Sequence, residues 1–304
     1  MRDGSRRSLL QSIGSVAFGG IALSGTTTAA PGNGKGSNSG KSNSGNGRGG
    51  GFPPKGITEW GDSIEIGNGE ISTFSSVTPS GKPKAVGVHF ADGTFDALPY
   101  AEDFESGDAT GMKIHGGFWS KPFNLDFPEN TPEPISYAGC GWNPGGHTPR
   151  GVYDKPHFDL HYHFYEPDPV SQIAPGVIED LPDEKIPDGY QLIEGGAIVP
   201  KMGAHLAPED APEFDDRNEA SDWQETLIWG VADVDDDGEY ENNYVEPMIT
   251  LDYFENHLDG VEKQDIPQPD VYPKEGHYPT TYTVRDLGDG GYAVVMEGFE
   301  ERSA

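Results

Sequence analysis

Cysteine is nearly absent from this 304-residue chain: Cys140 is the only one. A single thiol excludes an intrachain disulfide, so the fold has to depend on its hydrophobic core. Cys140 lies between glycines in the stretch SYAGCGWNPGG, without a second thiol or a base beside it in the sequence. We interpret it as a small packed residue rather than a nucleophile.

Long apolar runs are also scarce, and the one candidate lies at the N-terminus. The pair Arg6 and Arg7, in SRRSLLQ, is followed by an apolar stretch interrupted by Gly and Ser and then by TTTAA. The stretch is too short for a comfortable membrane span of roughly 20 residues. This layout is typical of a cleaved export signal of the twin-arginine type, and an uncleaved anchor is the alternative. We therefore predict a signal peptide over residues 1–30, export to the cell surface or the extracellular medium, and no stable membrane span after cleavage.

Residues 31–54 contain few side chains that a core could bury. They read PGNGKGSNSGKSNSGNGRGGGFPP, and such a Gly, Ser and Asn segment cannot offset the entropy lost on ordering. We predict a disordered linker here, followed by a single β-rich domain over residues 55–304.

Basic residues are few in that domain. Six of the 20 Lys and Arg and one of the 51 Asp and Glu precede residue 54, which leaves 14 basic and 50 acidic residues and a net charge of about −36. Such a charge excludes a phosphate-binding surface, so we expect no nucleic-acid partner. Acidic excess along the whole chain is typical of a halophile's solvated surface, where high salt screens the repulsion.

Short alternating apolar runs, separated by many of the 26 prolines and 43 glycines, predict β-strands. The predicted strands cover residues 63–77, 84–90, 156–165, 226–234, 239–245, 281–287 and 291–299. Gly-containing turns favour hairpins for the last two strands and for the pair 226–234 and 239–245. One helix is predicted over residues 247–260, where apolar side chains recur at helical spacing. The fold class is therefore mainly β, antiparallel and barrel- or sandwich-like, with a few short helices.

Three histidines fall within the stretch HFDLHYHFYE, which begins at His157. On a strand, successive side chains point to opposite faces. One face then holds Phe158, Leu160, Tyr162 and Phe164, and the other holds His157, Asp159, His161, His163 and Tyr165. The first is a core face, and the second is an outer face with an unusual number of imidazoles. Histidines two positions apart on one face can reach a common ion, and this spacing is a common way for β proteins to bind Zn, Cu, Fe or Mn.

A metal site on this strand needs ligands from other segments. His205, in PKMGAHLAPE, and Glu246, in YVEPMIT, are of suitable type. We predict a site for a divalent transition metal (Zn, Fe or Mn) with the candidate ligands His157, His161, His163, His205 and Glu246, and with Asp159 orienting a ligand imidazole. Two alternatives stay open, namely a pocket for an organic ligand or a subunit contact, and a plain polar network.

The acidic run DVDDDGEYENNY contains a weaker cation candidate. Asp233, Asp235 and Asp237, followed by Gly238, match the first half of a D-x-D-x-D-G calcium loop. The twelfth position is Tyr244 instead of Glu, and the run lies between two predicted strands instead of two helices. A hairpin turn is therefore the favoured interpretation, and calcium binding is the alternative.

Several blocks of the sequence, taken in order, resemble an uncharacterised domain family. They are WNPGGHTPRGVYDKPHFDLHYHF (142–164), PKMGAH (200–205), TLIWG (226–230), EPMIT (246–250) and GHYPTTYTVR (276–285). The family contains often exported bacterial and archaeal proteins and is typified by a thermophile protein controlled by an envelope-stress sigma factor. The resemblance covers roughly residues 60–297 and implies no activity. It places five residues on family motifs, namely His157, Asp159, His161, His205 and Glu246, whereas His163 departs from the family's pattern.

The sequence thus predicts an exported, halophilic protein that binds a divalent transition metal through a His/Glu cluster. The alternative is a non-enzymatic envelope-stress or ligand-binding protein without metal. A bound metal would polarise a substrate or activate water, but the sequence decides neither whether the protein is an enzyme nor which small molecule it binds. A homo-oligomer is compatible with both alternatives.

Overall fold

The computed structural model describes residues 51–214 and 223–304. The predicted signal peptide and residues 31–50 of the predicted linker lie outside this part of the chain, so both stay predictions. Strands make up 43% of the structure and helices 11%, and the sheets are antiparallel, which confirms the mainly β class. Among the described residues, no helix combines the length and the apolar character that crossing a membrane requires.

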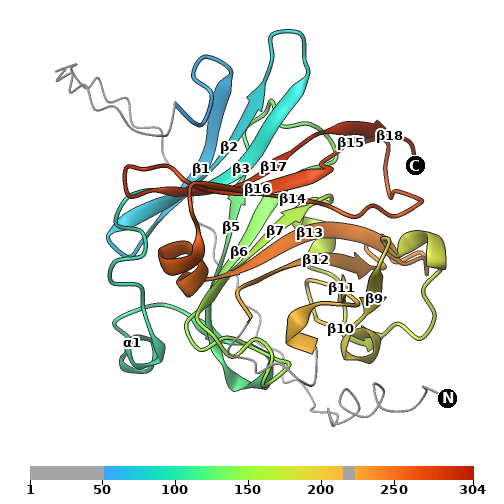
Figure 1. Ribbon diagram of the computed structural model, residues 1–304. Coiled ribbons are helices and arrows are strands. Elements are labelled where there is room, and N and C mark those ends of the chain that lie inside the picture. The colour runs from blue at the N-terminus through green and yellow to red at the C-terminus, as the bar shows by residue number, and fades with distance from the viewer. Residues whose placement is uncertain (1–50, 215–222) are drawn as a thin grey trace. The chain divides into compact units, whose positions relative to one another are not determined.

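Most strands belong to two sheets, which lie across one another in Figure 1. The six-stranded sheet has the order β1 (Thr58–Ile66), β2 (Gly69–Val77), β3 (Pro83–Phe90), β17 (Tyr292–Glu297), β16 (Thr281–Asp286) and β14 (Val261–Asp265). The eight-stranded sheet has the order β4 (Met112–Lys113), β5 (Trp119–Asp126), β6 (Tyr137–Asn143), β7 (His157–His163), β13 (Glu241–Thr250), β12 (Glu225–Ala232), β11 (Ala204–Pro208) and β9 (Tyr190–Leu192). Within the described residues neither sheet closes on itself, so the arrangement is a sandwich.

The remaining elements are small and lie between these strands. Two ribbons pair β8 (Gly176–Val177) with β10 (Ala197–Ile198) and β15 (Gly276–Tyr278) with β18 (Glu300–Arg302). The helical segments are α1 (Ala101–Ser106), α2 (Pro167–Val170), the 3-10 turns η1 (His115–Gly117), η2 (Asp183–Lys185), η3 (Glu194–Gly196) and η4 (Pro212–Phe214), and the π-helical turn η6 (Tyr253–His257). The prediction of only a few short helices is therefore confirmed.

Aromatic side chains fill the space between the two large sheets. Phe158 of β7 lies edge-on to Phe90 of β3, with ring centroids 5.2 Å apart. The Tyr162 hydroxyl of β7 donates a hydrogen bond to the Val294 carbonyl of β17 at 2.7 Å. Both side chains of β7 are fully buried, as are Leu160 and Phe164. The predicted core face of the histidine strand is thus confirmed.

The opposite face of the eight-stranded sheet is covered as well. A second hydrophobic cluster lies there, made of Tyr153, Ile193, Ala207, Trp223, Ile228, Tyr244 and Met248. The Trp223 ring packs edge-on against the His157 ring of β7, with centroids 4.9 Å apart. All seven residues of β7 are buried. The histidine face, predicted as an outer face, is therefore a polar layer inside the molecule, because loop residues cover it.

Most predicted strands are found within a few residues of their predicted ends, and both predicted hairpins are confirmed. The prediction of one strand over 63–77 is wrong, because β1 and β2 form a hairpin in which Gly67 has a φ of 59°. The predicted helix 247–260 is wrong over its first part. β13 continues to Thr250 between β7 and β12, and only the single turn η6 follows. Pairing with two neighbouring strands outweighs the helical spacing of the apolar residues.

Phe52 packs onto the six-stranded sheet, although the composition of residues 31–54 placed it in the predicted linker. Its ring lies edge-on to Phe74, with centroids 5.8 Å apart, and the Arg285 guanidinium lies 4.2 Å from the ring centre. One residue of the predicted linker thus contacts the folded domain, and the predicted boundaries of linker and domain stay predictions.

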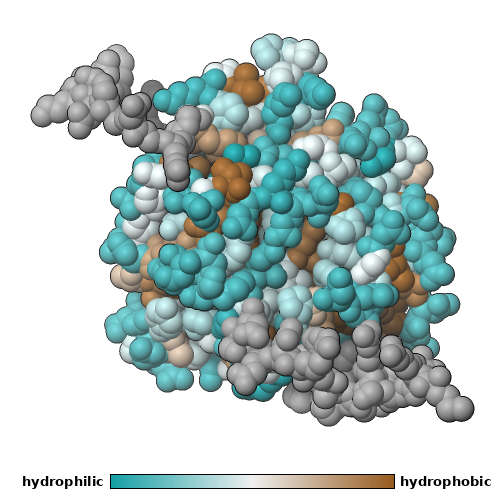
Figure 2. All heavy atoms as spheres, in the orientation of Figure 1, coloured by the Kyte–Doolittle hydropathy of each residue, from teal (hydrophilic) through white to brown (hydrophobic). Residues whose placement is uncertain are grey.

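Hydrophilic residues cover most of the face shown in Figure 2, with apolar residues in smaller patches. The exposed large apolar side chains of the described chain are Trp60, Tyr100, Met112, Val177, Val261 and Val271. This polar surface agrees with the acidic composition, and salt dependence stays a prediction.

Candidate metal centre

The strand β7 lies between β6 and β13, and glycines on β6 leave room beside its polar side chains. Gly139 lies opposite His161, and Gly141 lies opposite Asp159. A Cβ atom at Gly139 would come within 3.0 Å of the Nε2 of His163. Because these two positions of β6 have no side chain, the imidazoles and the carboxylate of β7 can share one layer.

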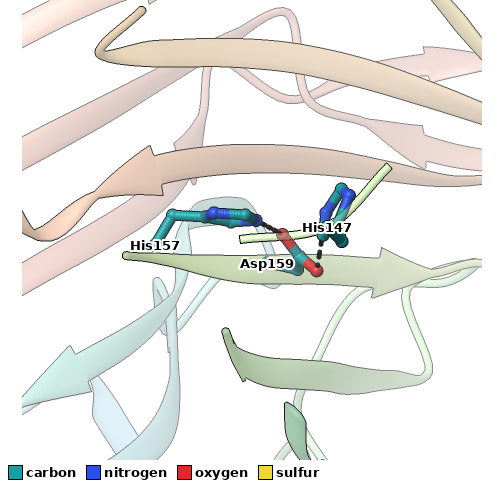
Figure 3. A group of neighbouring side chains, drawn as sticks. All are labelled: His147, His157 and Asp159. Carbon is teal, nitrogen blue, oxygen red and sulfur yellow. Dashed lines mark ion pairs between the residues drawn. The ribbon is translucent and has the colours of Figure 1, made fainter. Parts of the chain in front are cut away.

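His147, His157 and Asp159 form a buried group in this layer, and the Asp159 carboxylate lies between the two imidazole rings (Figure 3). The Nε2 of His157 is 3.0 Å from the Asp159 Oδ1, and the Nε2 of His147 is 3.4 Å from the Oδ2. One ligand atom of each residue lies within 4.8 Å of the other two. No second group of three such side chains meets this distance within residues 51–214 and 223–304.

Hydrogen bonds to the backbone fix the tautomers of both histidines. The Nδ1–H of His157 donates to the Lys155 carbonyl, and that of His147 donates to the Thr148 carbonyl, each at 2.7 Å. Because a carbonyl only accepts, each Nδ1 carries the proton, and each neutral ring presents a lone pair at its Nε2. Both lone pairs face the Asp159 carboxylate. At such distances they repel its oxygens unless a cation, either a proton or a metal ion, lies between them.

The neighbouring Asn143 indicates that the Nε2 of His157 is unprotonated. The Asn143 amide donates to the Asp159 Oδ2 at 2.7 Å and also lies 3.3 Å from the His157 Nε2, which can accept from it. The buried Asp159 Oδ1 has no hydrogen-bond donor in the described part of the chain. A carboxylate oxygen without a donor, beside an imidazole lone pair without a proton, fits a metal ion as the missing partner.

Without a metal, protons have to balance the charge of this group. Burial lowers the pKa of His147 most strongly, but the Asp159 carboxylate, the hydrogen bond to the Thr148 carbonyl and the charge of Glu194 together raise that pKa above its usual value. Burial also disfavours an ionised Asp159, yet His147 and then His157 hold the pKa of Asp159 well below its usual range. The carboxylate is therefore ionised and available as a ligand.

The separations in the group suit one bound ion. Two donors held at about 2.1 Å from a tetrahedral metal are about 3.4 Å apart, and the carboxylate–imidazole separations here are 3.0 and 3.4 Å. The His147 side chain is 18% exposed and that of His157 is 0% exposed, so an ion would enter past His147. A cleft of about 440 Å³ lies elsewhere, beside Tyr190 and Gln264, and none of the three residues lines it. The group of His147, His157 and Asp159 therefore does not belong to that cleft.

The other predicted ligands lie in the same polar layer. The Nε2 of His161 is 3.2 Å from the Oε1 of Glu246, and the His163 ring stacks on the Tyr137 ring with centroids 4.3 Å apart. His205 is partly exposed on β11, and burial lowers its pKa to about 3. His205 does not form a three-ligand group with His161 and Glu246 in the described chain, so their shared ion stays a prediction.

The three candidate calcium ligands lie in the turn between β12 and β13. Asp233 accepts hydrogen bonds from the amides of Asp237 and Gly238 at 3.1 and 3.0 Å, and Asp237 accepts from Glu239 at 2.9 Å. Asp235 belongs to the same turn. These carboxylates stabilise a hairpin turn, which is the interpretation that the sequence favoured, and calcium binding stays untested.

His147 was not among the predicted ligands, and Asp159 was predicted only to orient one. The available signal was the position of His147 in the same sequence block, ten residues before His157. Gly146 has a φ of 74°, and a Cβ there would overlap the Tyr153 carbonyl oxygen. The loop turns tightly at this glycine and so brings His147 over β7.

Comparisons with protein-family models, with curated proteins and with solved structures found no match for this chain. The resemblance to an uncharacterised family therefore stays an expectation. Evidence for function comes from the side chains of the chain itself.

Proposed function

We propose that this protein binds one divalent transition-metal ion through the Nε2 atoms of His147 and His157 and the carboxylate of Asp159. The observation that carries the proposal is that the Nε2 atoms of two imidazoles, each of which donates from Nδ1 to a backbone carbonyl, face one carboxylate at 3.0 and 3.4 Å. Two imidazoles and one carboxylate suit Zn, Fe and Mn, and three protein ligands leave positions for water or another ligand. An ion bound there would act as a Lewis acid toward a molecule that enters past His147.

The setting of this activity is proposed from the sequence. The Arg6–Arg7 pair supports export by the twin-arginine route, and the net charge of about −36 from residue 55 onward supports a saline environment. The protein would then bind its metal at the cell surface or outside the cell.

A metal-free binding protein is the second candidate, and one observation favours it. The raised pKa of His147 allows an imidazolium to neutralise Asp159, and the Asn143 amide donates to the same carboxylate. In that case the group is a hydrogen-bonded network inside an exported ligand-binding or envelope-stress protein. The two candidates differ in whether the protein holds metal in stoichiometric amount.

Competition titration tests the metal proposal. Full-length protein is stripped with a chelator and titrated with Zn²⁺, Fe²⁺ or Mn²⁺ against a chromophoric chelator. Loss of a group that only orients a ligand costs about 10- to 100-fold in metal affinity. We expect His147→Gln to weaken binding by on the order of 100-fold or more, since one of three protein ligands is lost. The matched control is His257→Gln, because His257 also faces an acid, Asp252, at 3.2 Å, but both side chains are about half exposed.

The control variant should bind metal as the wild-type protein does. A wild-type protein without bound ion, or equal affinities for the two variants, would reject the metal site and favour the proton-balanced network.

A further inference from the structure

His161 and Glu246 repeat the arrangement found at Asp159. The Nδ1–H of His161 donates to the Gly139 carbonyl at 2.9 Å, so its Nε2 presents a lone pair. That Nε2 lies 3.2 Å from the Glu246 Oε1 but has no hydrogen-bond partner in the described chain. The side chains of His161 and Glu246 are only 6% and 2% exposed, so water hardly screens the pair.

Other unpartnered polar atoms lie around this pair. In the described chain, the Glu246 Oε2, the Tyr244 hydroxyl and the His163 Nδ1 are also buried without a hydrogen-bond partner. The His161 ring lies edge-on to Tyr244 and parallel to His163, with centroids 4.7 and 5.7 Å apart. Native interiors leave few polar atoms unpaired. Four in one layer leave hydrogen-bonding capacity that water, a shared proton or a bound ion would satisfy.

We infer that this layer binds a second divalent transition-metal ion, held by the Nε2 of His161 and the carboxylate of Glu246. Their separation of 3.2 Å is that of two donors about 2.1 Å from one ion. As in His147 and His157, the Nδ1–H of His161 donates to a backbone carbonyl, and this hydrogen bond leaves the Nε2 of the neutral ring as the metal-binding atom. The second ligand set shares no residue with the first, so each site can exist without the other.

Cross-strand pairing explains why these two ligands meet. Val245 lies opposite Tyr162 in the register of β13 and β7, so the next pair along the two strands is Glu246 and His161. In an antiparallel pair, directly opposite side chains are the closest neighbours across the sheet. A shared proton is the competing way to join them, and it needs no metal.

Metal stoichiometry separates these possibilities. The full-length chain is stripped with a chelator and titrated with Co²⁺, whose visible absorption changes as each site fills, and bound metal is counted after equilibrium dialysis. We expect two ions per wild-type chain and one ion per chain in both Glu246→Gln and Asp159→Asn. Glu213→Gln is the matched control for the first variant, because Glu213 is also buried and has an unpartnered Oε2. It should keep two ions.

The other possible metal counts decide between the first site, at Asp159, and the second site, at Glu246. One ion in the wild type that is kept in Glu246→Gln and lost in Asp159→Asn overturns the second ion and leaves the first. One ion lost only in Glu246→Gln supports the second site and overturns the first. No bound ion overturns both. If Glu246→Gln does not fold, the wild-type endpoint and Asp159→Asn decide together. Two ions in the wild type, or one ion that Asp159→Asn keeps, support the second site, and one ion that Asp159→Asn loses overturns it.

Discussion

Replacing Asp159 by asparagine removes one charge from the proposed site and hardly changes its volume. The carboxylate accepts from Asn143 at 2.7 Å and faces the Nε2 atoms of His157 and His147 at 3.0 and 3.4 Å. An amide carries no charge, so a protonated His147 loses its counter-charge in this group. Removing one partner of a buried charge pair costs about 3–5 kcal/mol of unfolding free energy. At about 2–4 °C per kcal/mol for a domain of this size, the thermal midpoint should fall by about 6–20 °C.

The metal gives this variant a second signature. An ion at 100 times its Kd stabilises the wild-type protein by about 2.7 kcal/mol, which is a rise of about 5–11 °C on the same scale. Asp159→Asn should lose this rise in the thermal midpoint, and any stabilisation by zinc that remains comes from the second site proposed above. Thermal melts followed by circular dichroism, with EDTA and with ZnCl₂, measure both effects.

The control for these melts is Asp154→Asn, an exposed acid of the neighbouring loop that accepts from the Gly151 amide at 2.9 Å. It should change the unfolding free energy by less than about 0.5 kcal/mol. An Asp159→Asn protein that melts like this control, or that gains as much from zinc as the wild type does, refutes the assignment of Asp159 as a ligand.

Three further predictions concern other parts of the chain. Burial lowers the pKa of His205 to about 3 and that of His163 well below its usual value. Both therefore stay neutral in the folded state while the unfolded chain takes up protons below about pH 6.5. The metal-free protein should lose up to about 1.4 kcal/mol per pH unit and per histidine as the pH falls from 6.5, and equal urea midpoints at pH 7 and pH 5 would contradict this. The thermal midpoint should rise from low to molar salt as the Debye length falls from about 10 to 3 Å, and a flat midpoint removes the halophile interpretation. Arg6→Lys combined with Arg7→Lys should leave the protein inside the cell, and normal secretion of that double variant would rule out the twin-arginine route.

The histidine strand was predictable from sequence because a strand has a period of two. Phe158 and Leu160 lie on the core face as the alternation requires, and His157 and Asp159 lie on the other. The alternation does not tell whether a polar face meets solvent or a covering loop. That depends on residues distant in sequence, such as Trp223, which packs against His157.

The incorrect prediction of a helix that starts at residue 247 has a local cause. β13 is buried on both faces, with Val245 and Ile249 in one cluster and Tyr244 and Met248 in the other, so no polar alternation marks it as a strand. Pro247 also lies opposite Leu227 in the interior of the sheet, where strand rules disfavour proline. The sequence pattern pointed to a helix, and pairing with two neighbours overrides it.

The position of His147 was not predictable from spacing. Its place over β7 depends on a loop that turns at Gly146, and its carboxylate partner Asp159 comes from a different element. The role of Asp159 was underestimated for the same reason. From sequence alone, a carboxylate close to histidines can be either a group that orients a ligand or a ligand itself. Only the positions of both Nε2 atoms relative to the carboxylate distinguish these two roles.

The most direct test of the metal site is an anomalous difference map from a crystal grown with Zn²⁺ or Mn²⁺, recorded at the absorption edge of that metal. The proposed site predicts a peak about 2.0–2.2 Å from the Nε2 atoms of His147 and His157 and from a carboxylate oxygen of Asp159. A map without a peak among these three side chains, from crystals that show bound metal elsewhere, would contradict it.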